Sequence, residues 1–223
     1  MSEWNELLLD AVKVGDLAEV KRLVEHGADL HADDDYALRL AAIYGHLDVV
    51  KFLVEQGADI HVGDDLALRW AAIYGHLDVV KFLVEQGADI HTNDDIAIMH
   101  AAGDGHIDAV KYLVEQGADI HADDDYALRR AASHGHLEVV KYLVEQGADV
   151  QAANNDALRR AADEGHIAVV EFLLEKGCPV NVAKEHGTDA IKDFCKAYEL
   201  QKMLGAKLHQ SAPTKPKAAR LKI

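Results

Sequence analysis

The sequence repeats itself every 30 residues, and this periodicity constrains the fold more than any other feature of the chain. The pair Gly-His recurs at that interval from Gly45-His46 to Gly165-His166, and the tetrapeptide Gly-Ala-Asp-Ile recurs at the same interval. Six frames therefore begin at residues 1, 31, 61, 91, 121 and 151, with no insertion or deletion between them. Such a chain has no single core, because each unit buries its apolar face on the next one.

Each frame predicts two short helices joined by a tight turn. In residues 31–60 the first helix spans Tyr36 to Tyr44 and the second spans Leu47 to Gln56, with apolar residues at helical spacing and a glycine after each helix. Asp34 and Asp35 are N-cap candidates, since a short side-chain oxygen can accept from the free amides of a first turn. Isolated helices need about 12–15 residues in water, so stacking between frames has to hold these helices.

The run Ala-Ala-x-x-Gly-His-x-x-Val-Val-Lys-x-Leu-Val-Glu-x-Gly-Ala-Asp-Ile resembles the ankyrin repeat, and the resemblance covers roughly residues 3–182. It implies an all-α solenoid of stacked helix–turn–helix units. Ankyrin repeats have a period of about 33 residues, so each unit here lacks three residues in the loop before its first helix. We therefore expect truncated hairpin loops. Short-loop arrays of this kind are similar to those of giant viruses, phages and parasites, which implies a host-directed role.

The two ends of the array differ from its middle, as the exposed end units of a solenoid must. Residues 1–182 hold the six repeats, and residues 183–204 predict a C-terminal capping helix with Phe194 and Tyr198 turned inward. Residues 205–223, which contain two prolines and several basic residues, predict a flexible basic tail.

Charge divides the chain into two parts. Residues 1–183 carry a net charge of −21 and residues 184–223 a net charge of +5, so the whole chain carries −16. The acidic array repels nucleic acid at long range, and we expect no direct nucleic-acid binding. No run approaches the roughly 18–20 apolar residues of a membrane helix. The first residues are acidic, unlike a secretion signal, and the two cysteines form no disulfide framework. These features predict a cytoplasmic protein, and we expect a monomer.

No feature of the sequence predicts catalysis, a metal site or a bound cofactor. Histidines recur in two series, beginning at His31 and His46, whose members are one repeat or about 10 Å apart. A zinc ion needs ligands at about 2.0–2.1 Å, so neither series converges on a metal. The ankyrin resemblance implies instead that His46 and its equivalents bond turn backbone. Residues 33–35 and 123–125 are all aspartate but lack the pattern of a calcium loop, so we expect them to cap helices and pair with arginines. Phosphate-loop and nucleophile motifs do not occur, and we expect a protein that is not an enzyme.

Positions that vary between frames indicate the surface that recognises a partner. They lie on the first helix of each unit, whose outer side lines the concave groove in ankyrin-like arrays. We call this surface the first-helix face. Its candidate binding residues are Arg39, Tyr44, Arg69, Trp70, Tyr74, His100, Asp104, Arg129, Arg130, His134, Arg159 and Arg160. The N-terminal half is aromatic and the C-terminal half basic, and both residue types dominate interface energetics. A structural interpretation is also open, in which Trp70 packs under its neighbour and the arginines neutralise the aspartates.

Three functions fit these observations. The leading hypothesis is an adaptor or inhibitor that presents a rigid curved surface to a protein partner. The second is an acidic mimic of nucleic acid that occupies a basic cleft of a nucleic-acid-binding protein. The third is capture of a phosphate-bearing ligand by the arginines between Arg129 and Arg160, since guanidinium groups suit phosphate.

Overall fold

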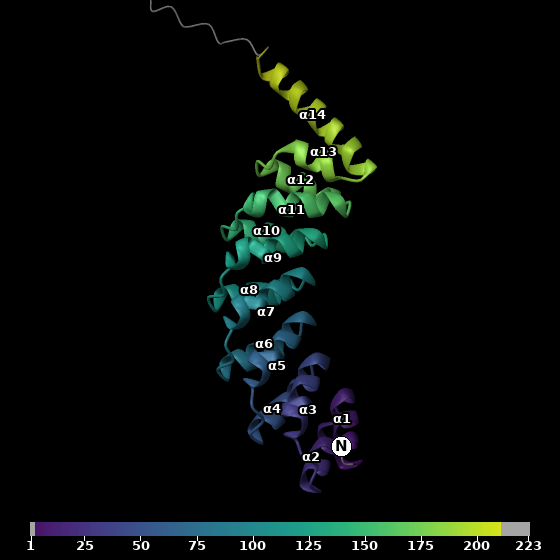
Figure 1. Ribbon diagram of the computed structural model, residues 1–223, viewed down its shortest axis with the longest axis vertical. Coiled ribbons are helices and arrows are strands. Elements are labelled where there is room, and N and C mark those ends of the chain that lie inside the picture. The colour runs from purple at the N-terminus through teal and green to yellow at the C-terminus, as the bar shows by residue number, and fades with distance from the viewer. Residues whose placement is uncertain (1–2, 211–223) are drawn as a thin grey trace, which may run out of the picture.

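The chain folds as an all-α solenoid in the computed structural model, which describes residues 3–210 (Figure 1). The sequence-based prediction of the fold is confirmed, and the described residues contain no strand. The helices are α1 (Glu3–Val14), α2 (Leu17–Glu25), α3 (Ala32–Tyr44), α4 (Leu47–Glu55), α5 (Val62–Ile73), α6 (Leu77–Glu85), α7 (Thr92–Gly103), α8 (Ile107–Glu115), α9 (Ala122–Ser133), α10 (Leu137–Glu145), α11 (Ala152–Asp163), α12 (Ile167–Glu175), α13 (Val180–His186) and α14 (Asp189–Gln210).

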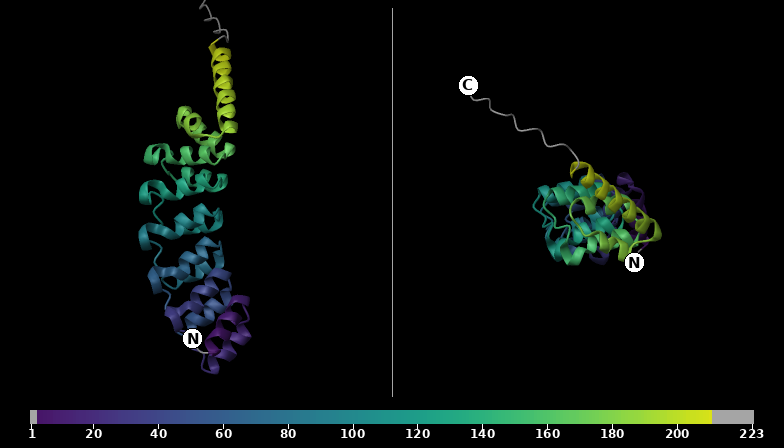
Figure 2. Two further views of the ribbon diagram at one scale, coloured as in Figure 1. Left: turned by 45° about the vertical axis from the view of Figure 1, so that its right-hand side comes forward. Right: turned by 90° about the horizontal axis from the view of Figure 1, so that it is seen from above.

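The helices form two layers. The first helices of successive units pack closely along the stack, and the second helices lie behind them with looser mutual contact (Figure 2). The close packing is possible because each first helix from α3 to α11 carries two adjacent buried alanines, such as Ala41 and Ala42. Leucines including Leu38 and Leu53 are fully buried between units, and each contributes about 1.5–3 kcal/mol by leaving water. Closer spacing in one layer bends the array toward that layer, so the first-helix face lies inside the curve.

A turn of left-handed backbone lies inside the N-terminal end of each first helix from α3 to α11, before its right-handed part. Asp33, Asp34 and Asp35 have φ angles of 54°, 54° and 52°, so the right-handed part of α3 begins at Tyr36, where the sequence predicts it. Most residues avoid this conformation, and Gly, Asn and Asp tolerate it best. The equivalent positions of the later frames are occupied by these three residue types except at Ala153. A run of such residues therefore replaces the longer hairpin loop.

The prediction that Asp34 and Asp35 cap the first helix is wrong. The Asp35 carboxylate is buried and accepts a hydrogen bond from His31 Nδ1 at 2.8 Å, whereas Asp34 is exposed. In a later frame the equivalent carboxylate also binds the connector that leads to the next unit, since Asp95 Oδ1 accepts from Asp119 N at 2.9 Å. The left-handed turn is the physical reason, because it carries these side chains away from the free amides of the helix.

The Gly-His pairs join consecutive units. His76 Nε2 donates to Ile43 O at 2.9 Å, which confirms the role that the ankyrin resemblance implies. Gly45, with a φ angle of 74°, lies directly under the His76 ring, and a Cβ atom there would overlap the imidazole. The other pairs make equivalent bonds, from His46 to Lys13 O, from His106 to Ile73 O, from His136 to Gly103 O and from His166 to Ser133 O.

The C-terminal end departs from the repeat. Helix α13 packs on α11 as the next helix of the first layer, and α14 then projects beyond the stack (Figures 1 and 2). Ile191 and Cys195 face inward and are fully buried. The helix continues through Gly205 to Gln210, six residues past the predicted end of the cap, because one glycine inside a helix costs only about 1 kcal/mol. Residues 211–223 of the predicted tail lie outside the described residues.

Candidate functional site

An aromatic patch occupies the N-terminal half of the first-helix face. Trp70 stacks on Tyr74 with ring centroids 6.1 Å apart, and Tyr74 stacks on His76 at 6.4 Å. Tyr44 stacks on His46 at 6.2 Å in the preceding unit. Tyr44 and Tyr74 remain 48% and 50% exposed. These rings are held in place by neighbours of their own unit and still offer apolar surface to a partner, as hot-spot residues do.

The arginines at the C-terminal end of the face meet on one buried carboxylate. Asp156, which is 3% exposed, accepts from Arg160 Nε at 2.6 Å, from Arg129 Nη1 at 3.3 Å and from Arg159 Nη2. Burial raises the pKa of Asp156, but the hydrogen bond from Arg160 and the charges of Arg160, Arg159 and Arg129 lower it further than burial raises it. These three guanidinium groups are thus already paired with a carboxylate of the protein itself.

Two arginines of the face also fold back on the left-handed turn of their own unit. Arg39 Nη2 donates to Asp33 O at 2.5 Å, and its guanidinium lies 5.2 Å from the centroid of the Tyr36 ring. Arg129 Nη2 donates to Asp123 O at 2.7 Å in the same way. The structural interpretation, that the arginines neutralise the aspartates of the turns, agrees with Arg129, whose Nη2 also lies 3.4 Å from Asp123 Oδ2, whereas Arg39 bonds the turn through a backbone carbonyl.

The middle of the face presents two arginines that the structure does not pair. Within the described residues, the side chains of Arg69 and Arg130 have no hydrogen bond and no ion pair. Arg130 lies across Gly103, where a Cβ atom would come within 2.9 Å of its Nε. Burial and the charge of Arg130 lower the pKa of His100, Asp104 opposes that shift, and Arg69 adds to it. Both guanidinium groups are therefore close enough to lower the pKa of His100. Because that pKa lies below its ordinary value of 6.5, the imidazole is mostly neutral at pH 7, and the arginines are the cations of this region.

The remaining candidate residues lie at the edge of this region. Asp104 is exposed on the turn after α7, and His134 is exposed on the turn after α9. His134 stacks on His136 at 6.2 Å, and its Nδ1 lies 2.9 Å from Arg130 O. Ten of the twelve predicted residues thus belong to the aromatic patch, to a set of arginines bonded to aspartate residues, or to a central band that shares Trp70 and Tyr74 with the patch. We define the central band as Arg69, Trp70, Tyr74, His100 and Arg130.

Two residues that shape this surface were missed by the sequence analysis. Asp156 takes the frame position that Tyr36 and Tyr126 occupy, and a charged residue at an otherwise apolar position signals a buried ion pair. Gly103 replaces the isoleucine of the earlier frames and makes room for Arg130. Both signals are visible in the aligned frames, but the partners become evident only when neighbouring units are stacked.

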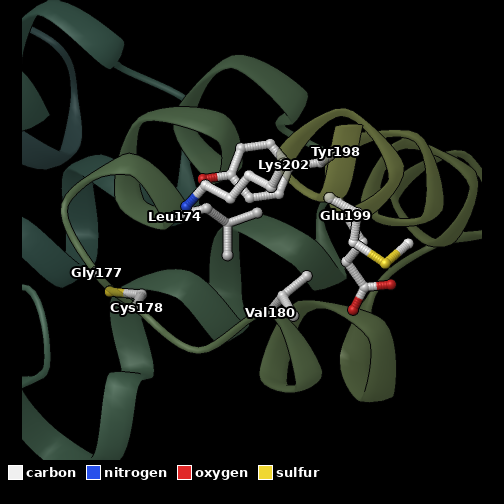
Figure 3. A pocket seen from close by; sticks show the side chains of 8 residues that line it. Leu174, Gly177, Cys178, Val180, Tyr198, Glu199 and Lys202 are labelled. Carbon is white, nitrogen blue, oxygen red and sulfur yellow. The ribbon is translucent and has the colours of Figure 1, made fainter. Parts of the chain in front are cut away.

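A second candidate is a pocket of about 630 Å³ at the C-terminal end, between α12, α13 and α14 (Figure 3). We call it the C-terminal pocket; it is lined by Leu174, Gly177, Cys178, Val180, Tyr198, Glu199, Lys202 and Met203. Its volume is in the range of small-molecule sites, about 300–1,000 Å³. The repeat pattern does not predict this pocket, because the pocket forms where the end of α12 meets a helix that leaves that pattern.

The described residues contain no group of three or more His, Cys, Asp or Glu side chains placed to hold a metal ion. Cys178 and Cys195 are buried free thiols. Burial raises the pKa of the Cys178 thiol to about 11, so the thiolate form is rare at neutral pH. Over residues 3–210, none of the helices combines the length and apolar character that crossing a membrane requires.

Comparison with known families gives one match. Residues 8–94 and 98–184 match the family model described as ankyrin repeats (3 copies). A comparison with curated protein sequences finds no match. Ankyrin repeats are generally protein–protein interaction modules, and the proteins that carry them are typically non-enzymatic binding scaffolds.

Proposed function

The chain belongs to the ankyrin repeat family, and we propose that it binds another protein through the central band of its first-helix face, as an adaptor or an inhibitor. One observation carries the proposal: the half-exposed Tyr74 ring stacks on Trp70, the sequence neighbour of Arg69, and the side chains of Arg69 and Arg130 have no hydrogen-bond or ion-pair partner within the described residues. A stacked array is rigid, so little conformational freedom is lost when a partner docks on it. The short-loop units resemble viral and parasite arrays, which makes a protein of a host cell, and the host cytoplasm, the first partner class and compartment to test.

The chemistry of the central band favours an extended acidic segment of the partner. Trp70 and Tyr74 provide a flat apolar surface for an aromatic or aliphatic side chain. Arg69 and Arg130 lie two units apart in sequence, on either side of His100. One unit advances about 10 Å along the stack, and an extended peptide advances about 3.3 Å per residue. A segment with an apolar residue between two carboxylates, roughly six residues apart, therefore matches the band.

A library of random peptides displayed on phage tests this chemistry without knowledge of the natural partner. We expect the full chain to enrich peptides with acidic residues around an aromatic or aliphatic residue. The variants Trp70→Ala and Arg130→Glu should lose these peptides. Trp4→Ala and Lys141→Glu are matched controls, because they make the same changes on α1 and α10, outside the band, and should keep the peptides. Enrichment of lysine-rich peptides, or retention by both band variants, would place the interface elsewhere.

The same four variants can be used as baits in affinity purification from a native host, with quantitative mass spectrometry. A protein that binds through the band is recovered by the unaltered chain and by Trp4→Ala and Lys141→Glu. It is depleted by Trp70→Ala and Arg130→Glu. Equal recovery with all five baits contradicts the proposal.

Mimicry of nucleic acid is a second candidate, favoured by the exposed carboxylates of the left-handed turns. Asp34, Asp64, Asp94 and Asp124 are exposed at the same position of four successive units, so negative charge recurs at a regular interval along one edge. A basic cleft bound to this edge should dissociate steeply as salt rises. Capture of phosphate by the Arg129–Arg160 group finds less support, because Asp156 already occupies three of its guanidinium groups.

A further inference from the structure

The C-terminal pocket has apolar walls. Leu174 is buried at the end of α12, and Val180 faces it from the start of α13 (Figure 3). Met203 comes from α14 and is 56% exposed, so the pocket opens to solvent along that helix. A small molecule with an apolar body can therefore enter from the side of α14 and cover these side chains.

Two polar groups at the pocket have no hydrogen-bond or ion-pair partner among residues 3–210. The Tyr198 hydroxyl is buried and has no hydrogen-bond partner within the described residues. The Lys202 ammonium lies 4.8 Å from the centroid of the Tyr198 ring, and the described residues offer it no carboxylate. Figure 3 shows the Lys202 chain running along that ring. An orphaned hydroxyl in a buried position costs free energy, which a ligand acceptor can recover.

The charges of the other lining residues leave the pocket with an excess of positive charge. Glu199, the only carboxylate of the lining, already binds Lys184 with an N–O distance of 2.6 Å. Cys178 donates from Sγ to Val150 O at 3.3 Å, and burial keeps its thiol protonated. A ligand therefore meets one free cation and one free hydroxyl donor, and no reactive thiolate.

We propose that the C-terminal pocket binds a small amphipathic anion, whose carboxylate accepts hydrogen bonds from Tyr198 and Lys202 and whose apolar chain lies against Leu174, Val180 and Met203. The site is separate from the first-helix face and does not depend on the protein-binding proposal. Charge complementarity selects the anion, because a cationic amphiphile would bring a second positive charge beside Lys202. Apolar contact alone would accept a neutral chain equally well.

Calorimetric titration of the full chain with three probes that each carry a ten-carbon chain tests this inference, with decanoate and decyltrimethylammonium kept below their micelle concentrations and decanol below its solubility limit. We expect decanoate to bind at about one site per chain and about tenfold more tightly than decanol, a difference of about 1.4 kcal/mol. Decyltrimethylammonium should give no saturable heat. Equal affinities for decanoate and decanol would overturn the inference, and so would the absence of saturable binding by decanoate.

Variants assign the binding to this pocket. Lys202→Met should weaken decanoate about tenfold and leave decanol unchanged, whereas Lys196→Met is the matched control on the same helix and should change neither. Lys196 is 70% exposed and pairs with Asp193, outside the pocket lining. Tyr198→Phe should weaken decanoate severalfold without lowering the melting temperature, because it removes an orphaned hydroxyl rather than a bond. Unchanged decanoate affinity in both pocket variants would refute the assignment.

Discussion

Replacing Asp95 tests whether the buried carboxylates of the left-handed turns hold the connector that leads from one unit to the next. Asp95 is 6% exposed, and its Oδ1 accepts from His91 Nδ1 at 3.0 Å and from Asp119 N at 2.9 Å. A hydrogen bond to a charged group contributes about 1.5–3 kcal/mol. The bond to His91 counts for less, because that side chain is 57% exposed and water can replace it. We expect Asp95→Ala to lower the free energy of unfolding by about 3 kcal/mol, of which about 2 comes from the amide bond and about 1 from left-handed alanine.

Asp94→Ala is the matched control for this experiment. Asp94 has a φ angle of 56°, close to the 61° of Asp95, but its side chain is exposed and has no hydrogen bond within the described residues. It should therefore show only the backbone cost of about 1 kcal/mol. Urea unfolding followed by far-ultraviolet circular dichroism measures both variants. If the two midpoints coincide, the carboxylate does not hold the connector and the reasoning fails.

Three further predictions follow from individual contacts. Gly75→Ala should lower the melting temperature more than Gly87→Ala. Both glycines have positive φ angles, but only at Gly75 would a Cβ atom overlap a side chain, the His106 ring. Equal melting temperatures of the two variants would contradict the packing argument. Asp156→Asn should destabilise the protein most above about pH 4 and progressively less in acid, because the arginines hold the folded-state pKa of Asp156 below its unfolded value of about 3.9. The stability that this carboxylate adds is present above the unfolded pKa and is lost as pH falls through the folded pKa, so a pH-independent difference between parent and variant would count against it. Both thiols should resist Ellman's reagent at pH 8 in the folded protein and react once it is denatured, since burial raises the pKa of Cys178 and of Cys195; rapid reaction without denaturant would show that the C-terminal end opens.

The sequence predicts the two layers of the fold well, because each of the six frames places its two helices at equivalent positions. Its prediction of the segment at residues 33–35 is wrong in a specific way. Aspartate before a helix is most often a cap. Aspartate is also, with Asn and Gly, one of the residues that best tolerate left-handed backbone, and this second preference applies here. Comparing the frames exposes the second preference, since Gly63, Asn93 and Asn155 stand at positions where aspartate stands elsewhere. The end of α14 was misplaced because a single glycine weakens a helix without stopping it.

The candidate site could be predicted as a surface but not as a set of contacts. Frame position alone identifies Arg129, Arg130 and Arg159 as equally available cations. In the structure Arg129 and Arg159 reach Asp156, whereas Arg130 lies over Gly103 and stays free of partners within the described residues. Which arginine is neutralised depends on distances across the boundary between units. The sequence of the chain carries no direct record of those distances.

The two surfaces proposed for binding differ in the sign of their response to salt, and this difference can identify the one that is used. An acidic segment that binds the central band must first approach an array with a net charge of −21. Screening weakens that long-range repulsion, so the association rate should rise as salt increases from about 0.01 M to 0.15 M, over which the Debye length falls from about 30 Å to about 8 Å. The contacts with Arg69 and Arg130 are partly buried and lose less, so the dissociation rate should change little.

A basic partner on the aspartate turns should show the opposite behaviour. Its association rate should fall steeply over the same range of salt, because attraction to the array is then the force that is screened. Stopped-flow or surface-plasmon measurements with a labelled partner distinguish the two cases. An association rate that falls with salt and is unaffected by Arg130→Glu would move recognition from the central band to the turns.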